Sequence, residues 1–209
     1  MQPRVVRSTP ASRPATQPRG RIRIIGGVWK RTPIPVADAP GLRPTPDRVR
    51  ETAFNWIMHC HGGTLAGLSA LDLFAGTGAM GFEAASRGAA RVVLVEQDRA
   101  ALYALAALKD KLVAANIEIR PADALATAHT LIRDQERFDI IFLDPPYRSE
   151  WMARLLPLAA TLCYPTGSIY AEADSALEGA ALAACGLEML RKDKAGEVFY
   201  HLLRRKNDE

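Results

Sequence analysis

The chain has 209 residues, of which 48% are hydrophobic and 24% are charged, an ordinary balance for a soluble globular protein with one large domain and a short appendage. No apolar run approaches the roughly 20 residues that cross a membrane, and the arginine-containing N-terminus lacks the apolar core of a secretory signal, so we expect neither a membrane partner nor export. Three widely spaced cysteines, Cys60, Cys163 and Cys185, argue against a disulfide framework and indicate a reducing, cytoplasmic location.

The net charge of +4 conceals an uneven distribution along the chain. Residues 1–50 hold eleven Lys and Arg against two Asp, a sum of +9, whereas the remaining residues hold sixteen basic and twenty-one acidic side chains, a sum of −5. A basic arm on a mildly acidic body suggests a polyanionic partner, because each phosphate contact releases counterions. Charge alone does not distinguish such a partner from a solvated tail that binds nothing.

Composition and pattern divide the chain into a tail, an N-terminal unit and a main domain, at residues 1–20, 21–60 and 61–209. The tail is rich in Pro, Ser, Thr and Arg, and we expect it to be disordered because it cannot bury enough apolar surface. In the N-terminal unit, Gly26-Gly27 between apolar pairs predicts a two-residue β-hairpin turn. A helix is then expected with Thr45 as its N-cap and Pro46 in its first position.

Short apolar runs alternate with helical patterns from residue 69 onward. The predicted strands are Ala70–Phe74, Arg91–Val95, Ile117–Arg120, Phe138–Leu143, Gly167–Ala173, Leu187–Arg191 and Val198–Leu203. The predicted helices are Ala79–Arg87, Arg99–Ala115, Leu125–Arg133, Glu150–Leu162 and 175–184. This alternation predicts an α/β fold, a Rossmann-like, seven-stranded, mostly parallel sheet with an antiparallel C-terminal strand, helices on both faces and an N-terminal β-hairpin extension.

A glycine-rich turn lies between the first strand of this pattern and the helix that follows it. Gly76 and Gly78 occupy the turn and Gly81 lies in the first helical turn, where glycines allow a tight bend and close approach of a ligand to the backbone. Glu96 ends the next strand, eighteen residues after Gly78, where dinucleotide-binding folds place the acid that binds ribose hydroxyls. The loop and the acid together favour a nucleotide-like ligand over a purely structural turn.

The first strand and its loop read DLFAGTG over residues 72–78. This resembles the D-x-F-x-G-x-G motif of Rossmann-like methyltransferases, and it implies S-adenosylmethionine as cofactor and S-adenosylhomocysteine as product. That cofactor carries an amino acid in place of a phosphate, so an acid near its ammonium group makes electrostatic sense. The cofactor contacts implied here are Asp72, Phe74, Gly76, Gly78, Glu96 and Asp123. In this class Asp123 meets the adenine amino group; it is equally placed to cap a helix, and the two roles can coexist.

The strand Phe138–Leu143 ends in Asp144, Pro145, Pro146 and Tyr147, where two prolines fix two φ angles and remove two backbone donors. The tetrapeptide resembles the (D/N/S)-P-P-(Y/F/W) motif of amino-group methyltransferases, which implies that these four residues are catalytic and that Asp144 also borders the cofactor. The Asp144 carboxylate and the Pro145 carbonyl can hold the two hydrogens of an exocyclic amine, with its lone pair aimed at the methyl sulfonium, while Tyr147 stacks on the base. A Pro-Pro turn that merely ends a strand is the alternative.

The stretches RIIGGVWKRTPI and GLRPTPDRVRETAFNWI resemble the bacterial family that methylates the N2 amine of guanine 966 in 16S ribosomal RNA. The resemblance runs from about Arg23 to Leu203. It implies that the second stretch folds over the cofactor, with Arg43, Thr45 and Arg48 as candidates for contacts near its methionine end. The competing interpretation is that Arg48 and Arg50, each taken singly, are solvated helix residues.

The RNA substrate that this family implies agrees with the basic N-terminal third. The phosphate contacts that we expect there are Arg21, Arg23, Lys30 and Arg31. Such contacts position an RNA without reading its sequence, and the target base must be unstacked to reach the tetrapeptide. The expected partner is 16S ribosomal RNA in the small subunit or an assembly intermediate, and the expected state is a monomer.

Two other functions remain open from the sequence. An adenine-N6 methyltransferase acting on DNA shares the tetrapeptide but usually needs a sizeable target-recognition region, for which the short loops leave little room. A non-catalytic RNA-binding or assembly factor would have no need of the intact tetrapeptide. A metal site at residues 59–61, His-Cys-His, is not expected, because adjacent side chains diverge and no partner pair has ligand spacing.

Overall fold

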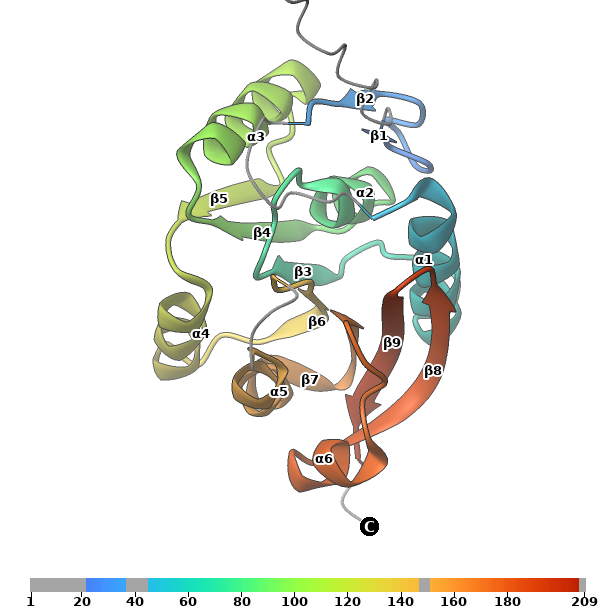
Figure 1. Ribbon diagram of the computed structural model, residues 1–209. Coiled ribbons are helices and arrows are strands. Elements are labelled where there is room, and N and C mark those ends of the chain that lie inside the picture. Colours follow the sequence, from blue (N-terminus) through green and yellow to red (C-terminus); the bar gives the residue numbers. More distant parts are fainter. Residues whose placement is uncertain (1–21, 37–44, 147–150, 207–209) are drawn as a thin grey trace, which may run out of the picture.

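The computed structural model describes residues 22–36, 45–146 and 151–206, which form a seven-stranded sheet with its helices and a separate two-stranded hairpin (Figure 1). The strands are β1 (Ile22–Arg23), β2 (Pro33–Ile34), β3 (Ser69–Asp72), β4 (Arg91–Glu96), β5 (Ile117–Pro121), β6 (Phe138–Leu143), β7 (Cys163–Ala173), β8 (Leu187–Ala195) and β9 (Val198–Arg205). The helices are α1 (Asp47–Cys60), α2 (Ala79–Ser86), α3 (Arg99–Leu112), α4 (Ala124–Arg133), α5 (Trp151–Leu162) and α6 (Gly179–Ala184). Every element predicted from residue 69 onward is present, with ends that differ by at most four residues.

The large sheet has the strand order β5-β4-β3-β6-β7-β9-β8. The five strands from β5 to β7 are parallel, and β9 pairs antiparallel with both β7 and β8. This confirms the predicted Rossmann-like sheet and its closing antiparallel hairpin. The chain runs outward from β3 to β5 and then crosses back to β6 on the other side of β3. Such a reversal opens a crevice at the carboxyl ends of the strands, where ligands bind in this class of sheet.

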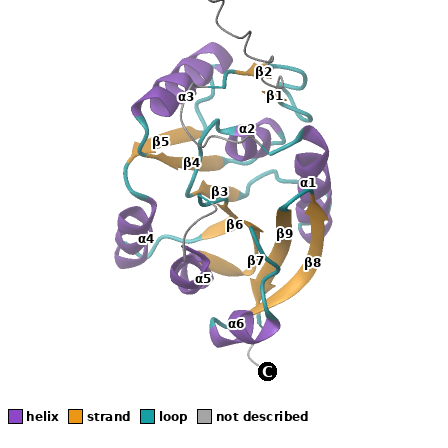
Figure 2. Cartoon of the chain, viewed as in Figure 1, coloured by secondary structure: helices purple, strands orange, loops and turns teal. Residues whose placement is uncertain are grey.

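Helices cover both faces of the sheet (Figure 2). One face packs against α1, α2 and α3, with Phe82 and Leu105 buried there. The other face packs against α4, α5 and α6, with Leu131 and Leu155 buried there. Successive side chains of a strand point to opposite faces of the sheet, so a strand covered on both faces is apolar throughout. This explains why the strands appear in the sequence as short continuous apolar runs. No helix in the described part of the chain is long and apolar enough to span a membrane.

The N-terminal hairpin is wider than the sequence predicted. Strands β1 and β2 pair antiparallel and leave residues 24–32 as their connection. The prediction of a two-residue turn at Gly26-Gly27 is therefore wrong. The backbone of this stretch bonds to side chains and carbonyls of α2. Tertiary hydrogen bonds thus replace the ladder hydrogen bonds that a tight hairpin would have made.

Helix α1 begins one residue later than predicted. Pro46, in an extended conformation, precedes Asp47 and supplies no side-chain cap. The prediction that Thr45 caps this helix is wrong, because its hydroxyl donates to Glu172 Oε1 of β7 at 2.9 Å. A hydrogen bond to a buried carboxylate is charge-assisted and stronger than one to a neutral group. Thr45 therefore ties the start of α1 to the sheet.

Glycines at the start of α2 let this helix lie close to the sheet. Gly78 has a φ of 77°, and a Cβ added there would lie 2.6 Å from Phe82 Cδ2. A Cβ added at Gly81 would lie 2.1 Å from Leu94 Cδ2 of β4. Gly81, within the first turn of α2, is thus needed for packing between helix and strand.

We predict that Gly81→Ala destabilises the fold by about 1–3 kcal/mol, because the methyl group overlaps a core side chain that has little room to move. Urea denaturation followed by circular dichroism measures the change. Gly179→Ala is the matched control, since a Cβ added at this first residue of α6 has no neighbour within 4 Å. Equal stability of Gly81→Ala and the wild type would contradict the packing argument.

Candidate active site at the carboxyl ends of the strands

Four carboxylates gather at the carboxyl ends of neighbouring strands. Asp72 ends β3, Glu96 ends β4, and Asp144 directly follows β6. Glu172 lies next to last in β7, whose Ala171 pairs with Leu143 of β6. The structure thus brings three predicted site residues to one edge and adds a fourth acid that sequence reasoning missed.

Glu96 holds the glycine-rich loop by its carboxylate. The Gly76 N–H donates to Glu96 Oε2 at 2.8 Å, and the N–H groups of Gln97 and Asp98 donate to Glu96 Oε1, each at 2.8 Å. Gly76 itself has a φ of 52°, in the left-handed region that glycine tolerates. A carboxylate has about four lone-pair directions, so Glu96 can bind the loop and still accept a hydroxyl. Its contact with a ribose stays a prediction.

Asp72 is an acid placed almost entirely inside the protein, with 3% of its surface exposed. The Phe74 N–H donates to Asp72 Oδ1 at 3.4 Å, which is a weak compensation. Burial, and next the charge of Glu96, raise the pKa of Asp72 to about 7. A cationic group of a ligand beside Asp72 would favour its ionised form.

Asp144 lies between two of these acids. Burial first, then the charge of Glu172, then that of Asp72, raise the pKa of Asp144 well above its ordinary value. Pro145 is buried and Pro146 is exposed, so the prolines hold the carboxylate where the strand leaves the core. Tyr147 lies outside the described residues, and its stacking role remains a prediction.

Glu172 connects the N-terminal segment to this edge. It is 2% exposed, and its Oε1 accepts the Thr45 hydroxyl at 2.9 Å and the Tyr170 hydroxyl at 2.8 Å. Burial and the charge of Glu172 raise the pKa of Tyr170 well above its ordinary value, so the phenol remains a donor. The signal that could have found Glu172 was an acid at the end of an apolar strand, the same signal that pointed to Glu96.

Two of the remaining predicted cofactor residues, Asp123 and Phe74, have structural contacts of their own. Asp123 is the N-cap of α4 and accepts from the Ala126 N–H at 2.9 Å, so its structural role is established and its adenine contact stays a prediction. Phe74 is half-buried and meets the Trp151 ring edge-on, with centroids 5.4 Å apart. Arg43 lies outside the described residues.

The three predicted RNA contacts among the described residues are all exposed, and one of them also forms an ion pair. Arg23 Nε donates to Asp47 Oδ2 at 3.0 Å. Lys30 and Arg31 are exposed in the hairpin connection, and Arg21 lies outside the described residues. Arg50 is not a solvated helix residue, since it is fully buried and bonds to Asp47 Oδ1 at 2.6 Å, whereas Arg48 is exposed.

Two histidines, His61 of the His-Cys-His stretch and His201 of β9, have structural contacts. A ring nitrogen of His61 lies 3.0 Å from Ser168 Oγ, and His201 accepts from the Leu177 N–H at 3.2 Å. Burial raises the pKa of Cys163 to about 12, which keeps this thiol protonated and unreactive. In the described part of the chain, no group of three or more His, Cys, Asp or Glu could hold a metal ion.

Comparison with known proteins agrees with this edge and this sheet. A family model described as "Conserved hypothetical protein 95" matches residues 22–204. Ribosomal RNA small subunit methyltransferase D of Escherichia coli is 36% identical over 187 residues, which cover 89% of this chain and 91% of that protein. The chain belongs to this methyltransferase family. The Haemophilus influenzae protein of the same name is 34% identical over 75% of this chain and 80% of its own length.

Solved structures show the same fold for members of the methyltransferase family and for more distant proteins. The Escherichia coli protein yhhF superposes with a TM-score of 0.73 at 34% identity, covering 90% of this chain and all of that one. A methylase of Haemophilus influenzae, HI0767, gives 0.72 at 29% identity over 90% of this chain and 100% of that one. The sheet order found here is therefore that of Rossmann-like methyltransferases.

We predict that Asp72→Asn stabilises the ligand-free protein more at pH 8 than at pH 5. The folded-state pKa of about 7 lies above the ordinary value of 3.8, so folded Asp72 binds its proton more tightly than unfolded Asp72. Wild-type stability therefore falls as pH rises from about 4 to about 7, by up to about 4 kcal/mol, and Asn removes this loss. Urea denaturation at both pH values measures it. An equal effect at both would contradict the raised pKa.

Proposed function

We propose that this chain is an S-adenosylmethionine-dependent methyltransferase that methylates the exocyclic N2 amine of a guanine in 16S ribosomal RNA of the small subunit. The observation that carries the proposal is the position of Asp144 and Pro145 at the end of β6, directly beside the glycine loop that follows β3. Membership in the family of ribosomal RNA small subunit methyltransferase D supports the RNA substrate.

The carboxyl edge fits the chemical groups of S-adenosylmethionine. Asp72 is a buried acid that a neighbouring ammonium group would ionise, and Glu96 is an acceptor suited to ribose hydroxyls. The residues that would hold the cofactor are Arg43, Thr45, Asp72, Phe74, Gly76, Gly78, Glu96, Asp123 and Asp144. When bound, the cofactor supplies an electrophilic methyl group on a sulfonium, and S-adenosylhomocysteine is its product. The reaction as proposed uses no metal.

The strand end supplies two acceptors for one amine. The Asp144 carboxylate and the Pro145 carbonyl accept the two N–H groups of the guanine N2 amine, whose lone pair is delocalised into the ring. Holding both hydrogens turns the lone pair out of conjugation and toward the methyl group, so the gain is orientation and electrostatics. Tyr147 stacks on the unstacked base.

Glu172 adds a second negative charge beside the reacting nitrogen. The nitrogen becomes positive as the new bond forms, and the neighbouring carboxylates Asp144 and Glu172 stabilise that charge. The raised pKa of Asp144 also makes it a better proton acceptor when the methylated nitrogen loses its extra proton. The proton passes from the nitrogen to a carboxylate oxygen of Asp144, and solvent then removes it.

An exocyclic adenine amine of DNA is the second candidate acceptor, since the same two acceptors could hold it. The described residues from 69 to 206 are occupied by consecutive strands and helices, apart from 147–150, and leave no room for an inserted target-recognition domain. The basic hairpin and the family of ribosomal RNA methyltransferases favour an RNA partner, which we take to be the small subunit or an assembly intermediate, bound by a monomer.

We predict that the wild type transfers label from methyl-labelled cofactor to N2-methylguanosine in unmodified small subunits or their precursors. Asp144→Ala should lower kcat at least about 100-fold, because one of two acceptors is lost, with cofactor binding retained. Nucleoside digestion identifies the product. Asp134→Ala, an exposed acid ahead of the amino end of β6, is the control. Label in N6-methyladenine of DNA, or full activity of Asp144→Ala, would sink the proposal.

The pH dependence tests the role of Glu172 separately. Turnover should rise with pH as Asp144 ionises, because only the carboxylate accepts both the hydrogen bond and the proton. Glu172→Gln removes the neighbouring charge that raises the pKa of Asp144 most, so this pKa falls and the acid limb of the kcat profile should move to lower pH. Glu188→Gln, which changes a half-buried acid paired with Arg204, should leave the limb in place. An unmoved limb in Glu172→Gln would refute the coupling.

A further inference from the structure

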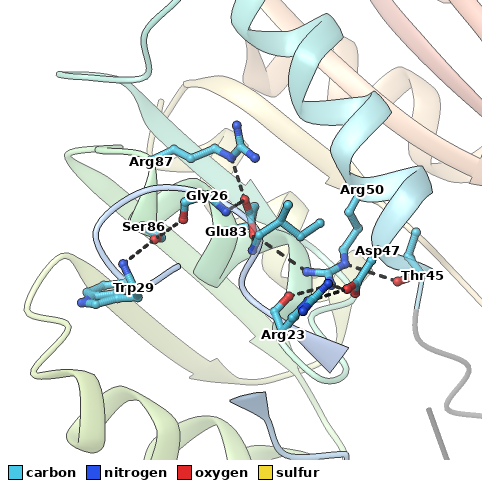
Figure 3. A network of polar contacts seen from close by, with 10 residues as sticks. Arg23, Gly26, Trp29, Thr45, Asp47, Arg50, Glu83, Ser86 and Arg87 are labelled. Atoms are coloured by element: carbon cyan, nitrogen blue, oxygen red, sulfur yellow. Dashed lines mark hydrogen bonds and ion pairs between the residues drawn. The ribbon is translucent and has the colours of Figure 1, made fainter. Parts of the chain in front are cut away.

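The connection between β1 and β2 contains a segment, Ile25–Arg31, that we call the docking loop. It lies against the last turns of α2 (Figure 3). The Ile25 N–H donates to Glu83 Oε2 at 2.6 Å, and the Gly26 N–H donates to Glu83 Oε1 at 2.8 Å. One carboxylate thus holds two consecutive backbone donors of the loop.

Glu83 is a buried acid with several polar partners. It is 0% exposed, and Arg87 Nε donates to Glu83 Oε1 at 2.7 Å. Arg50 of α1, also fully buried, places Nη1 3.9 Å from Glu83 Oε2 and donates from Nη2 to the Arg23 carbonyl at 2.8 Å. Figure 3 shows Glu83 between Gly26, Arg50 and Arg87. A buried carboxylate is costly unless it is paired, and Glu83 is paired by two backbone donors of the loop and by Arg87.

Ser86 holds the other half of the docking loop. Its hydroxyl donates to the Gly26 carbonyl at 2.6 Å and accepts from the Trp29 N–H at 2.9 Å, and its carbonyl accepts from the Val28 N–H at 2.8 Å. A Cβ added at Gly27 would lie 1.8 Å from the Ser86 carbonyl oxygen, so only glycine permits this approach. The backbone of the loop is therefore fixed on α2 before any partner binds.

The outward side of this fixed backbone carries one apolar and two cationic side chains. Val28 is 82% exposed, and Lys30 and Arg31 are exposed beside it. Arg31 has a φ of 72°, a conformation that costs a non-glycine residue roughly 1 kcal/mol, and its N–H donates to the Ile24 carbonyl at 2.8 Å. Trp29 packs inward against the core. The fixed backbone thus presents an exposed apolar side chain together with two cations.

The chemistry of this surface fits a structured RNA. Two cations attract phosphates, and the exposed apolar side chain of the same loop can contact the face of a base or a ribose. A fixed backbone loses little conformational entropy on binding, which raises affinity without new contacts. Helix α2, which holds the docking loop, begins directly after Gly78 of the glycine loop. The docking loop therefore lies about one length of α2, roughly 12 Å, from the candidate active site.

We propose that the docking loop is a preformed RNA-binding element in which Val28 contacts a nucleotide, Lys30 and Arg31 contact phosphates, and Glu83 and Ser86 act as positioning residues. This inference rests on the proposed function for its partner. The inference goes beyond the proposed function by assigning an apolar contact to RNA and by assigning the two α2 side chains that hold the surface in place.

Direct binding of protein-free small-subunit ribosomal RNA, with S-adenosylhomocysteine present, tests the proposal without turnover. Val28→Ser should weaken RNA binding about 3- to 10-fold, because an apolar contact is lost. Val113→Ser is the matched control, since Val113 is 83% exposed at the end of α3 and should change affinity less than twofold. Equal affinities of the two variants, or a loss confined to particles that contain ribosomal proteins, would overturn the proposal.

Ser86→Ala tests the positioning role, because it leaves every exposed side chain of the loop unchanged. It removes two hydrogen bonds to the loop and should lower RNA affinity several-fold with cofactor affinity unchanged. Combined with Val28→Ser, its effect should be less than additive, since both act through one surface. Strict additivity would overturn the positioning role. Should Ser86→Ala fail to fold, Val28→Ser alone decides.

The salt dependence gives a third readout. Lys30→Ala should reduce the slope of log affinity against log salt by about one, because one phosphate contact is lost. Lys111→Ala, an exposed lysine of α3, should not change the slope. If the wild type binds RNA but transfers no methyl group, the proposed function is refuted. The affinity ratios of the variants then still test the docking loop. Wild-type protein that binds neither protein-free RNA nor unmodified small subunits would refute both.

Discussion

The parallel pairing of β3 with β6 is the constraint on which the candidate active site depends. Asp72 lies opposite Phe142 in this ladder, two residues before Asp144, so the glycine loop and the Asp-Pro-Pro turn leave the sheet side by side. The chain reverses its winding direction between these two strands, which opens the crevice there. Helices packed on both faces keep the two strand ends in register.

Like charges held together inside the protein give this edge its chemical character. Asp72, Asp144 and Glu172 each raise the pKa of a neighbour, beyond the effect of burial itself. Such a cluster is unfavourable in the free protein and becomes favourable beside positive charge. A cofactor with a sulfonium and an ammonium group, and an amine that becomes positive during the reaction, would supply that charge. The fold thus holds a destabilised site that binding would relieve.

The N-terminal unit is joined to this edge by buried polar contacts. Thr45 bonds to Glu172 at the strand ends, and Arg50 and Glu83 join α1, α2 and the docking loop in one network (Figure 3). Helix α2 begins directly after the glycine loop, where we propose that the cofactor binds, and ends under the docking loop, where we propose that RNA binds. The two proposed sites therefore share one rigid support.

The sequence by itself determined what local rules control. Alternating apolar runs gave the order of strands and helices, and Gly76, Gly78 and the Asp-Pro-Pro turn marked the strand ends, because glycine and proline act on their own backbone angles. Only the tertiary structure decided that Thr45 bonds across 127 residues to Glu172, that the hairpin opens to bind α2, and that Asp144 has a raised pKa. Burial and long-range partners are sums over the whole packed chain, so no local pattern reports them.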